Sequence, residues 1–384
     1  MRVLHILSSD DQYGSAKSFL ELLDRELKTN DVEPYVVIPR QNKIADFCKK
    51  NKVKFLAVDY EQFQIPKHDN FFVFLLKYIF HFFNYCKKNK KAMQIIKKFA
   101  SDNRIDIIHT NSSVIDLGAI LHNELGIPHV WHLREFGKED FNFYSLKRNT
   151  INYMNNNANQ FLCISNAMKK SWVDKGLDKN KIVVISHGVD ANRFTKKSNC
   201  ISPDIKGVMC GSFSPGKGQH VLIEALNQLN EIEKQHVHVD FYGKEEGNYY
   251  KEFKNKIDEY NLQEVVDIKG FSSYMNEKLL MYNVGFNCSK AEAMGRVTVE
   301  YMMSGLCPVV SNSGANTEII GDNKCGLLYE NSTTALVDAL RYLLNNPKDI
   351  LKYGQKSFIV ARQKYDANKN IDKIIKNFFL MSSE

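Results

Sequence analysis

The stretch CSKAEAMGRVTVEYMMSG, residues 288–305, decides the fold of this 384-residue chain. It holds two acids, Glu292 and Glu300, with Gly295 and Arg296 between them. The preceding run FNCSK is typical of a strand, and the residues from Arg296 onward predict a helix with an apolar face. Both acids are therefore expected near the carboxyl end of a strand, which is where parallel α/β sheets bind their ligands.

Runs typical of strands and helices alternate on both sides of this stretch. Continuous apolar strands followed by helical segments favour parallel sheets covered on both faces, the doubly wound α/β class. Residues 190–206 are polar, contain a proline and predict a linker. The sequence predicts an N-terminal Rossmann-like domain over 1–190, a linker over 191–205, a second Rossmann-like domain over 206–365, and a C-terminal helix over 366–384 that packs back on the first domain.

The bulk composition is that of a globular protein with ample core material. Hydrophobic residues make up 43% and charged residues 25%, and the net charge of +8 favours anionic ligands or an anionic membrane surface. No nucleic-acid-binding motif occurs, so nucleic acid is not an expected partner. Eight cysteines without a CxxC pair predict reduced thiols and a cytoplasmic protein. The N-terminal run MRVLHILSS predicts a first strand rather than a signal peptide.

Four loops at the expected carboxyl ends of strands could face one interdomain cleft. They are SSDDQYGSA (8–16), HLREFG (132–137), GSFSPGKGQ (211–219) and SKAEAMGRV (289–297). The first loop lacks GxGxxG, which disfavours a dinucleotide cofactor and a dehydrogenase.

The segment GSFSPGKGQHVLIEAL, residues 211–226, predicts an anion site. Small residues let the N–H groups of a helix start approach a ligand closely, and Lys217 adds a positive charge beside Gly216. The segment does not match the Walker pattern, and an ordinary strand–helix turn with an exposed lysine is the alternative.

Glu292 and Glu300 suit a ligand with neighbouring hydroxyls. A carboxylate accepts two hydrogen bonds and therefore fits the diol of a ribose or a pyranose. Gly295 would leave backbone N–H groups open to the same ligand. From the spacing alone, the alternative is one acid at a helix start and one on the helix surface.

Residues 292–310, EAMGRVTVEYMMSGLCPVV, resemble the EX7E motif of the family-4 retaining glycosyltransferases of GT-B fold. The resemblance continues in SNSGANTEII (311–320) and GLLY (326–329), and upstream in ISHGVDANRF (185–194). The lysine loop resembles the family's phosphate-binding loop, and YGSAKSFLELLDREL (13–27) resembles its N-terminal glycine loop and helix. The resemblance implies two Rossmann-like domains that face each other across a cleft, and a glycosyltransferase activity.

The resemblance also implies a role for each matching residue. Lys217, in the loop with Ser212 and Gly216, would bind the diphosphate of the sugar donor. Glu300 would hold the ribose, and Glu292 would hold hydroxyls of the transferred sugar. Backbone N–H groups of Met294, Gly295 and Val297 would assist at the sugar and phosphate, and Gly14 would bring the N-terminal loop to the diphosphate.

The chain departs from the family's pattern at three places. Ser212 stands where the family has an arginine, so Arg296 or Arg134 is expected to supply the missing phosphate cation. The family's His-Asp pair is replaced by Arg134-Glu135, with His132 two residues earlier as a further substrate-binding candidate. The N-terminal Gly-Gly is Tyr13-Gly14.

The expected reaction breaks the bond between sugar C1 and the diphosphate oxygen. The resemblance implies retention of configuration, and positive groups aimed at the leaving phosphate would lower the barrier. No D-x-D motif occurs, which predicts that no divalent metal and no cofactor is required. Lys217 and Arg296 would then stabilise the leaving group as catalytic residues, together with Glu292 and Arg134.

Residues 71–99, FFVFLLKYIFHFFNYCKKNKKAMQIIKKF, combine aromatic residues with seven lysines. The apolar part is too short to cross a membrane, but the segment suits a helix lying on anionic lipid. The alternative is an inter-strand helix pair with a buried aromatic face. The first interpretation predicts peripheral association with the inner face of the plasma membrane.

The sequence therefore predicts a hexosyltransferase that uses a nucleotide-diphosphate sugar, with UDP as the expected nucleotide and a glycan or a lipid-linked oligosaccharide as acceptor. Abundant Lys, Asn and Ile favour an AT-rich bacterial genome and hence a surface polysaccharide pathway, such as capsule or lipopolysaccharide assembly. A non-catalytic nucleotide-sugar-binding subunit is the main alternative, supported by Ser212 and the Arg134-Glu135 pair. A nucleotide-sugar epimerase is a weaker one.

Overall fold

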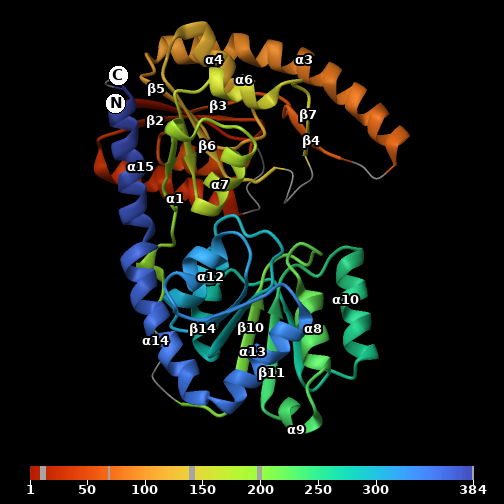
Figure 1. Cartoon of the computed structure of the whole chain (residues 1–384). Coiled ribbons are helices and arrows are strands. Elements are labelled where there is room, and N and C mark those ends of the chain that lie inside the picture. The colour runs from red at the N-terminus through yellow and green to blue at the C-terminus, as the bar shows by residue number, and fades with distance from the viewer. Residues whose placement is uncertain (9–13, 68–69, 138–142, 197–200, 383–384) are drawn as a thin grey trace. The chain divides into compact units, whose positions relative to one another are not determined.

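The computed structural model divides the chain into two compact units. The first comprises Met1–His187 with Asn368–Glu384, and the second comprises Gly188–Ala367. The structure describes residues 1–8, 14–67, 70–137, 143–196 and 201–382. Each unit is built on a parallel sheet with helices packed on it (Figure 1), which confirms the predicted pair of α/β, Rossmann-like domains.

The first unit holds a seven-stranded parallel sheet in the order β3-β2-β1-β5-β6-β8-β9. Its strands are β1 (Arg2–Ile6), β2 (Glu33–Ile38), β3 (Lys54–Ala57), β5 (Ile107–Thr110), β6 (His129–Leu133), β8 (Gln160–Cys163) and β9 (Ile182–Val184). The inner strands β1, β5 and β6 are buried along nearly their whole length, as strands covered on both faces should be. A separate antiparallel pair is formed by β4 (Gln64–Pro66) and β7 (Phe143–Ser145).

Seven helices described in this unit cover the sheet. They are α1 (Gly14–Thr29), α2 (Lys43–Lys50), α3 (Phe71–Asp102), α4 (Leu117–Leu125), α6 (Thr150–Asn156), α7 (Asn166–Asp174) and α15 (Ala367–Ser382). The C-terminal helix α15 returns to this unit: Asp372 bonds Arg25 of α1 at 2.7 Å, and Phe378 packs on His5 of β1.

The second unit holds a six-stranded parallel sheet in the order β12-β11-β10-β13-β14-β15. Its strands are β10 (Ile205–Cys210), β11 (Val237–Tyr242), β12 (Val266–Gly270), β13 (Val284–Asn287), β14 (Cys307–Ser311) and β15 (Leu327–Tyr329). Its longer helices are α8 (Gln219–Asn227), α10 (Asn248–Glu259), α12 (Arg296–Met303), α13 (Thr333–Asn345) and α14 (Pro347–Lys364), with short α9 (Glu231–Lys234) and α11 (Met275–Lys278). Two apolar clusters fill the opposite faces of this sheet.

The run QHVLIEALNQLNEIE, residues 219–233, forms two helices in the structure. The first, α8, ends at Asn227, and α9 begins at Glu231. Asn230 separates them with a capping box, because its side chain accepts from the N–H groups of Ile232 and Glu233 while the Glu233 side chain accepts from the Asn230 N–H.

The aromatic and lysine-rich segment forms the single helix α3 rather than a helix pair. Asn70 caps its start by accepting from the N–H groups of Phe72 and Val73, and no Gly or Pro interrupts the 32 residues that follow. The N-terminal end of α3 reaches past the strands of its sheet (Figure 1). Within the described residues, no helix is both long and apolar enough to span a bilayer.

Candidate functional site

Two loops of the second unit bring Lys217 and Glu292 together. Lys217 follows β10 and Glu292 follows β13, and these two strands are neighbours in parallel register. Their carboxyl ends therefore lie at the same edge of the sheet. Lys217 Nζ lies 3.3 Å from Glu292 Oε2. The Lys290 N–H also donates to the Gly216 carbonyl at 3.0 Å, which ties the two loops by their backbones.

The Glu292 carboxylate is nearly enclosed, with 8% of the residue exposed. Burial alone would raise its pKa, but the Lys217 ammonium, the Asn287 side-chain amide and the Gly295 N–H outweigh burial and hold the pKa below its usual value. Asn287 Nδ2 donates to Oε2 at 3.3 Å, and the Gly295 N–H donates to Oε1 at 3.1 Å. Glu292 is thus an ionised acid with a fixed orientation.

Gly295 differs from its predicted role. Its N–H was expected to be open to a ligand, but in the structure the Glu292 carboxylate accepts it. Gly295 adopts φ +72° immediately before α12, and a Cβ there would lie 2.4 Å from Ile319 Cδ1. This glycine is needed for the sharp turn between the two acids.

Arg296 and Glu300 form a pair within the first turns of α12. Arg296 Nε lies 3.3 Å from Glu300 Oε1, the i,i+4 spacing that places both on one helix face. Both side chains are largely buried, with about 13% and 14% exposed. Arg296 therefore lies at the start of the helix that follows Glu292, and its contact in the structure is the second acid of the motif.

The remaining candidates in this unit are backbone positions around the same two loops. The Ser212 carbonyl accepts from Gln219 Nε2 at 2.9 Å, so this loop folds back onto the start of α8. Met294 and Val297 flank Gly295, and the first N–H groups of α12 point out of the helix start, as in every α-helix. The roles predicted for Ser212, Gly216, Met294 and Val297 stay predictions.

A buried polar network under Glu292 was not predicted. Asn287 Nδ2 donates to Thr298 Oγ1 at 2.9 Å, and Thr298 Oγ1 donates to Asn316 Oδ1 at 2.9 Å. Glu292 is also fixed through its backbone, because its carbonyl accepts the Ala315 N–H at 2.7 Å. The signal in the sequence was the presence of Asn and Thr within apolar runs, where polar side chains need partners.

The carboxyl edge of the first unit's sheet carries His132, Arg134 and Glu135 at the end of β6. Arg134 Nε donates to Asn111 Oδ1 at 2.7 Å. Glu135 accepts from the Ser112 hydroxyl at 2.9 Å and from the Ser113 N–H and hydroxyl at 3.0 and 2.8 Å. In this structure Glu135 holds the turn after β5.

His132 is completely buried. Burial, with the nearby Arg134 guanidinium as the next cause, holds its pKa well below the usual range, so the ring is neutral. His132 Nδ1 lies 3.1 Å from His109 Nε2, whereas His132 Nε2 has no hydrogen-bond partner among the described residues. Gly14 is the first residue of α1, and residues 9–13 of its loop, with Tyr13, lie outside the described part of the chain.

One group of side chains has the spacing of a cation site. His238, Asp240 and Asp267 on β11 and β12 offer ligand atoms within 4.8 Å of one another. Lys269 Nζ, however, lies 2.6 Å from Asp267 Oδ2 and 3.7 Å from Asp240 Oδ1, so an ammonium group already supplies a positive charge there. This group belongs to strands on the far side of β10 from Glu292.

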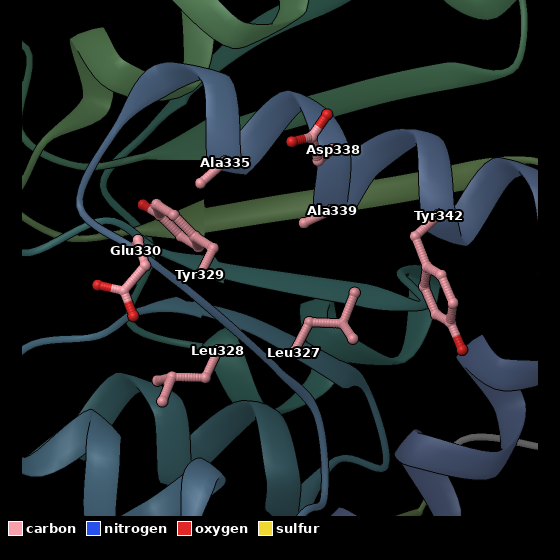
Figure 2. A pocket seen from close by; sticks show the side chains of 8 residues that line it. All are labelled: Leu327, Leu328, Tyr329, Glu330, Ala335, Asp338, Ala339 and Tyr342. Atoms are coloured by element: carbon pink, nitrogen blue, oxygen red, sulfur yellow. The ribbon is translucent and has the colours of Figure 1, made fainter.

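Figure 2 shows an open hollow between β15 and α13. Aliphatic and tyrosine side chains line it together with Glu330 and Asp338, and none of its lining residues is a lysine or an arginine. Two acids without a cation would repel a diphosphate. The hollow contains none of the predicted site residues.

Two family models match the chain. The model described as Glycosyltransferase Family 4 matches residues 16–193, and the one described as Glycosyl transferases group 1 matches residues 191–360. An uncharacterized glycosyltransferase of Methanocaldococcus jannaschii is 27% identical over 260 residues, which covers 66% of this chain and 70% of that protein.

Solved structures share the whole fold at low sequence identity. Anabaena HepE, solved in complex with UDP and glucose, has a TM-score of 0.76 at 19% identity and covers 98% of this chain and 99% of its own. A glycosyltransferase of Rickettsia africae has a TM-score of 0.78 at 17% identity and covers 99% of this chain and 98% of its own.

Proposed function

The chain belongs to the family-4 glycosyltransferases of GT-B fold, and we propose that it moves a hexose or N-acetylhexosamine from a UDP-sugar to a glycan or lipid-linked acceptor. The observation that carries the proposal is the Lys217–Glu292 pair at the carboxyl edge of the second sheet. One cation and one ionised acid, held 3.3 Å apart on adjacent loops, suit a donor with an anionic diphosphate and a hydroxyl-rich sugar. UDP is the proposed nucleotide because HepE has been solved with UDP-glucose.

Each residue of this group takes one part of the donor. Lys217 binds the diphosphate as a point charge, assisted by the N–H groups at the start of α8. Glu300 accepts hydrogen bonds from the ribose hydroxyls, and Glu292 accepts them from the transferred sugar. Arg296 turns from Glu300 toward the leaving phosphate, in place of the arginine that Ser212 replaces.

The reaction breaks the bond between C1 of the sugar and the diphosphate oxygen and forms a bond between C1 and the oxygen of the acceptor hydroxyl. Negative charge grows on the leaving phosphate, and Lys217 stabilises it in the transition state more than in the ground state. Retention of configuration is proposed from the resemblance of residues 292–310 to the family's motif. The leaving phosphate would accept the proton of the acceptor hydroxyl, and no divalent metal would be needed.

We also propose that α3 holds the protein on a membrane, where a lipid-linked acceptor would be found. Nine large apolar side chains in its first half are exposed, with 36–74% of each residue in solvent: Phe71, Phe72, Val73, Leu75, Leu76, Ile79, Phe80, Phe82 and Phe83. The opposite side of the helix packs on the unit through Phe74 and Tyr85. Tyr144 of β7 adds a half-exposed ring, 5.3 Å from that of Phe74. Such a concentration of exposed apolar side chains marks an interaction surface.

The charge along α3 favours an anionic bilayer over a protein partner. Leu76, Phe80, Phe83, Lys87 and Lys90 follow one another at spacings of four and three, so they form one line along the helix. The apolar end spans roughly 18 Å at 1.5 Å per residue, and the basic end follows it. No acid occurs between residues 71 and 101. An obliquely inserted helix would place the rings among acyl chains and the lysines at phosphate level.

A donor assay tests the proposed activity. The purified protein is incubated with UDP-, GDP- and ADP-sugars, with and without EDTA, and release of the nucleoside diphosphate is followed. We expect slow release from one UDP-sugar that survives EDTA and is lost in Lys217→Ala and Glu300→Ala. Binding without release, even after addition of a membrane lipid extract, would instead support a non-catalytic subunit in surface polysaccharide assembly.

A further inference from the structure

Three histidines of the first unit lie side by side on neighbouring strands. His5 of β1 and His109 of β5 are register partners, and His132 of β6 lies two residues beyond Val130, the register partner of His109. Because side chains alternate across a sheet, all three lie on the same face. Glu26 of α1 faces them, and all four side chains are fully buried.

The four side chains form one continuous chain of hydrogen bonds. Glu26 Oε2 lies 3.1 Å from His5 Nε2, His5 Nδ1 lies 2.8 Å from His109 Nδ1, and His109 Nε2 lies 3.1 Å from His132 Nδ1. The rings are held from the sides as well: Phe19 packs on His5, and Phe378 packs on both His5 and His109. These four hydrogen-bonded side chains are therefore a fixed part of the core.

One hydrogen on each ring, with the Glu26 carboxylate as the acceptor at the end, sets one direction for every bond. His5 then donates through Nε2 and its Nδ1 is a bare acceptor. His109 must then donate through Nδ1, which leaves its Nε2 as the acceptor for His132 Nδ1–H. Three rings with one hydrogen each supply three N–H groups, and the three contacts use all of them. Nothing is left to protonate His132 Nε2.

The charges at the two ends of this row of hydrogen bonds, Glu26 at one end and Arg134 beside His132 at the other, favour hydrogen bonds that all point toward Glu26. Burial holds the pKa of both His109 and His132 well below the usual range, so cationic rings are disfavoured. The Arg134 guanidinium lowers both pKa values further. A positive group beside His132 repels an N–H at that end, and a carboxylate at Glu26 attracts one at the other.

We propose that Glu26, His5 and His109 are positioning residues that hold His132 in its Nδ1–H tautomer, with the Nε2 lone pair ready to accept a hydrogen bond from a substrate hydroxyl. His132 Nε2 is a buried atom without a partner among the described residues, and His132 is the last residue but one of β6, near the carboxyl edge of the sheet. Isolated neutral histidine prefers the Nε2–H tautomer, so the row of hydrogen bonds from Glu26 is what reverses this preference at His132. The use of His132 in catalysis depends on the proposed function, whereas its tautomer does not.

Nitrogen NMR of histidine-labelled protein at pH 7.5 tests the proposal without substrate. Bare and protonated ring nitrogens have distinct ¹⁵N shifts, and the signals are assigned by loss in His5→Asn, His109→Gln and His132→Gln. We expect a protonated Nδ1 and a bare Nε2 on His132. Glu26→Gln, of nearly the same shape, should convert part of His132 to the Nε2–H form, whereas Asp24→Asn on the exposed side of the same helix should leave its signals unchanged.

Turnover supplies the second readout. Glu26→Gln is expected to lower kcat at least tenfold while the Kd for UDP stays within twofold, because the substitution leaves every residue of the Lys217 group unchanged. A thermal scan checks that the variant is folded. A His132 that carries hydrogen on Nε2 in the wild type, or that ignores Glu26→Gln, overturns the proposal. If no donor is hydrolysed by the wild type, the proposed activity fails but the NMR result still decides the tautomer.

Discussion

Lys217 Nζ lies 3.3 Å from Glu292 Oε2, so in this structure the cation proposed for the diphosphate is paired with the acid proposed for the sugar. The two roles are therefore coupled: a diphosphate that approaches Lys217 meets the negative charge of Glu292 at short range. We expect Glu292→Gln to abolish turnover yet to tighten UDP binding by about two- to tenfold, because the repelling charge is removed.

Lys217→Ala should weaken UDP binding about tenfold or more, because the cation that binds the diphosphate is removed.

Isothermal titration with UDP measures both effects. Lys254→Ala, an exposed lysine of α10, removes the same charge as Lys217→Ala and should change the Kd little. Weaker UDP binding in Glu292→Gln would show that the carboxylate supports the diphosphate site rather than competing with it.

The lysine loop contains two glycines with different steric surroundings. A Cβ on Gly218, where φ is +73°, would lie 2.2 Å from the Cys288 carbonyl oxygen, whereas a Cβ on Gly216 would have nothing within 4 Å. Gly218→Ala should therefore reduce the free energy of unfolding by about 1–3 kcal/mol and separate the two loops, while Gly216→Ala should stay within about 0.5 kcal/mol of wild type. Chemical denaturation of the two variants makes the comparison, and equal losses in both would refute the steric explanation.

The meeting of Lys217 and Glu292 could be predicted from sequence because it follows from topology. Each residue comes after an apolar strand, and parallel neighbours end at the same edge. The direction of the Gly295 N–H could not be predicted, because it depends on where the Glu292 side chain turns within its own loop. The network from Asn287 to Asn316 was missed for a related reason: its members are far apart in sequence and meet only after α12 packs on the sheet.

The contacts among the three histidines could not be predicted from the sequence either. His5, His109 and His132 each stand in a run that predicts a strand, but their contact requires the register of three strands and the face that each side chain takes. For α3 the sequence left two interpretations open, a surface helix and a helix pair. Continuous helical hydrogen bonding without Gly or Pro makes one helix, and only packing reveals that Phe74 and Tyr85, rather than Phe80 and Phe83, face the unit.

Buried neutral histidines should make the stability of the protein depend on pH. Burial lowers the pKa of His129 to about 3, and those of His109 and His132 also lie well below the usual range. Below pH about 6.5 the unfolded chain binds protons at these residues and the folded protein does not, so stability is present above that pH and is lost as pH falls. Each such residue contributes a slope of about 1.4 kcal/mol per pH unit.

Urea unfolding between pH 7.5 and pH 5 measures that slope. His129 is the suitable residue to change, because its ring bonds the Asn157 carbonyl and the Thr110 hydroxyl at 2.8 Å each and lies outside the chain from Glu26. His129→Gln should lower stability at pH 7.5 but reduce the slope by about 1.4 kcal/mol per pH unit. An unchanged slope would mean that His129 is protonated in the folded protein.

The apolar end of α3 should decide membrane binding. Phe80 and Phe83 are 71% and 66% exposed, and their insertion into lipid would contribute on the order of 1.5–3 kcal/mol each. Replacing both with serine should lower binding to vesicles rich in phosphatidylglycerol by roughly tenfold or more. Phe271→Ser is the matched control, because Phe271 is 70% exposed and belongs to the second unit.

The basic end of α3 should decide lipid preference. Lys87→Gln with Lys91→Gln is expected to weaken binding to anionic vesicles by roughly tenfold, at about 1 kcal/mol per lysine, and to leave the weaker binding to phosphatidylcholine unchanged. High salt should have the same effect on wild type and little on the lysine variant, because screening acts on the charges and not on the rings. Flotation of the protein with vesicles of both compositions separates the two contributions. Two results would contradict membrane binding by α3: equal flotation of all variants, or loss of flotation in Phe271→Ser instead of in the α3 variants. Either result would favour a protein partner for the exposed rings of α3.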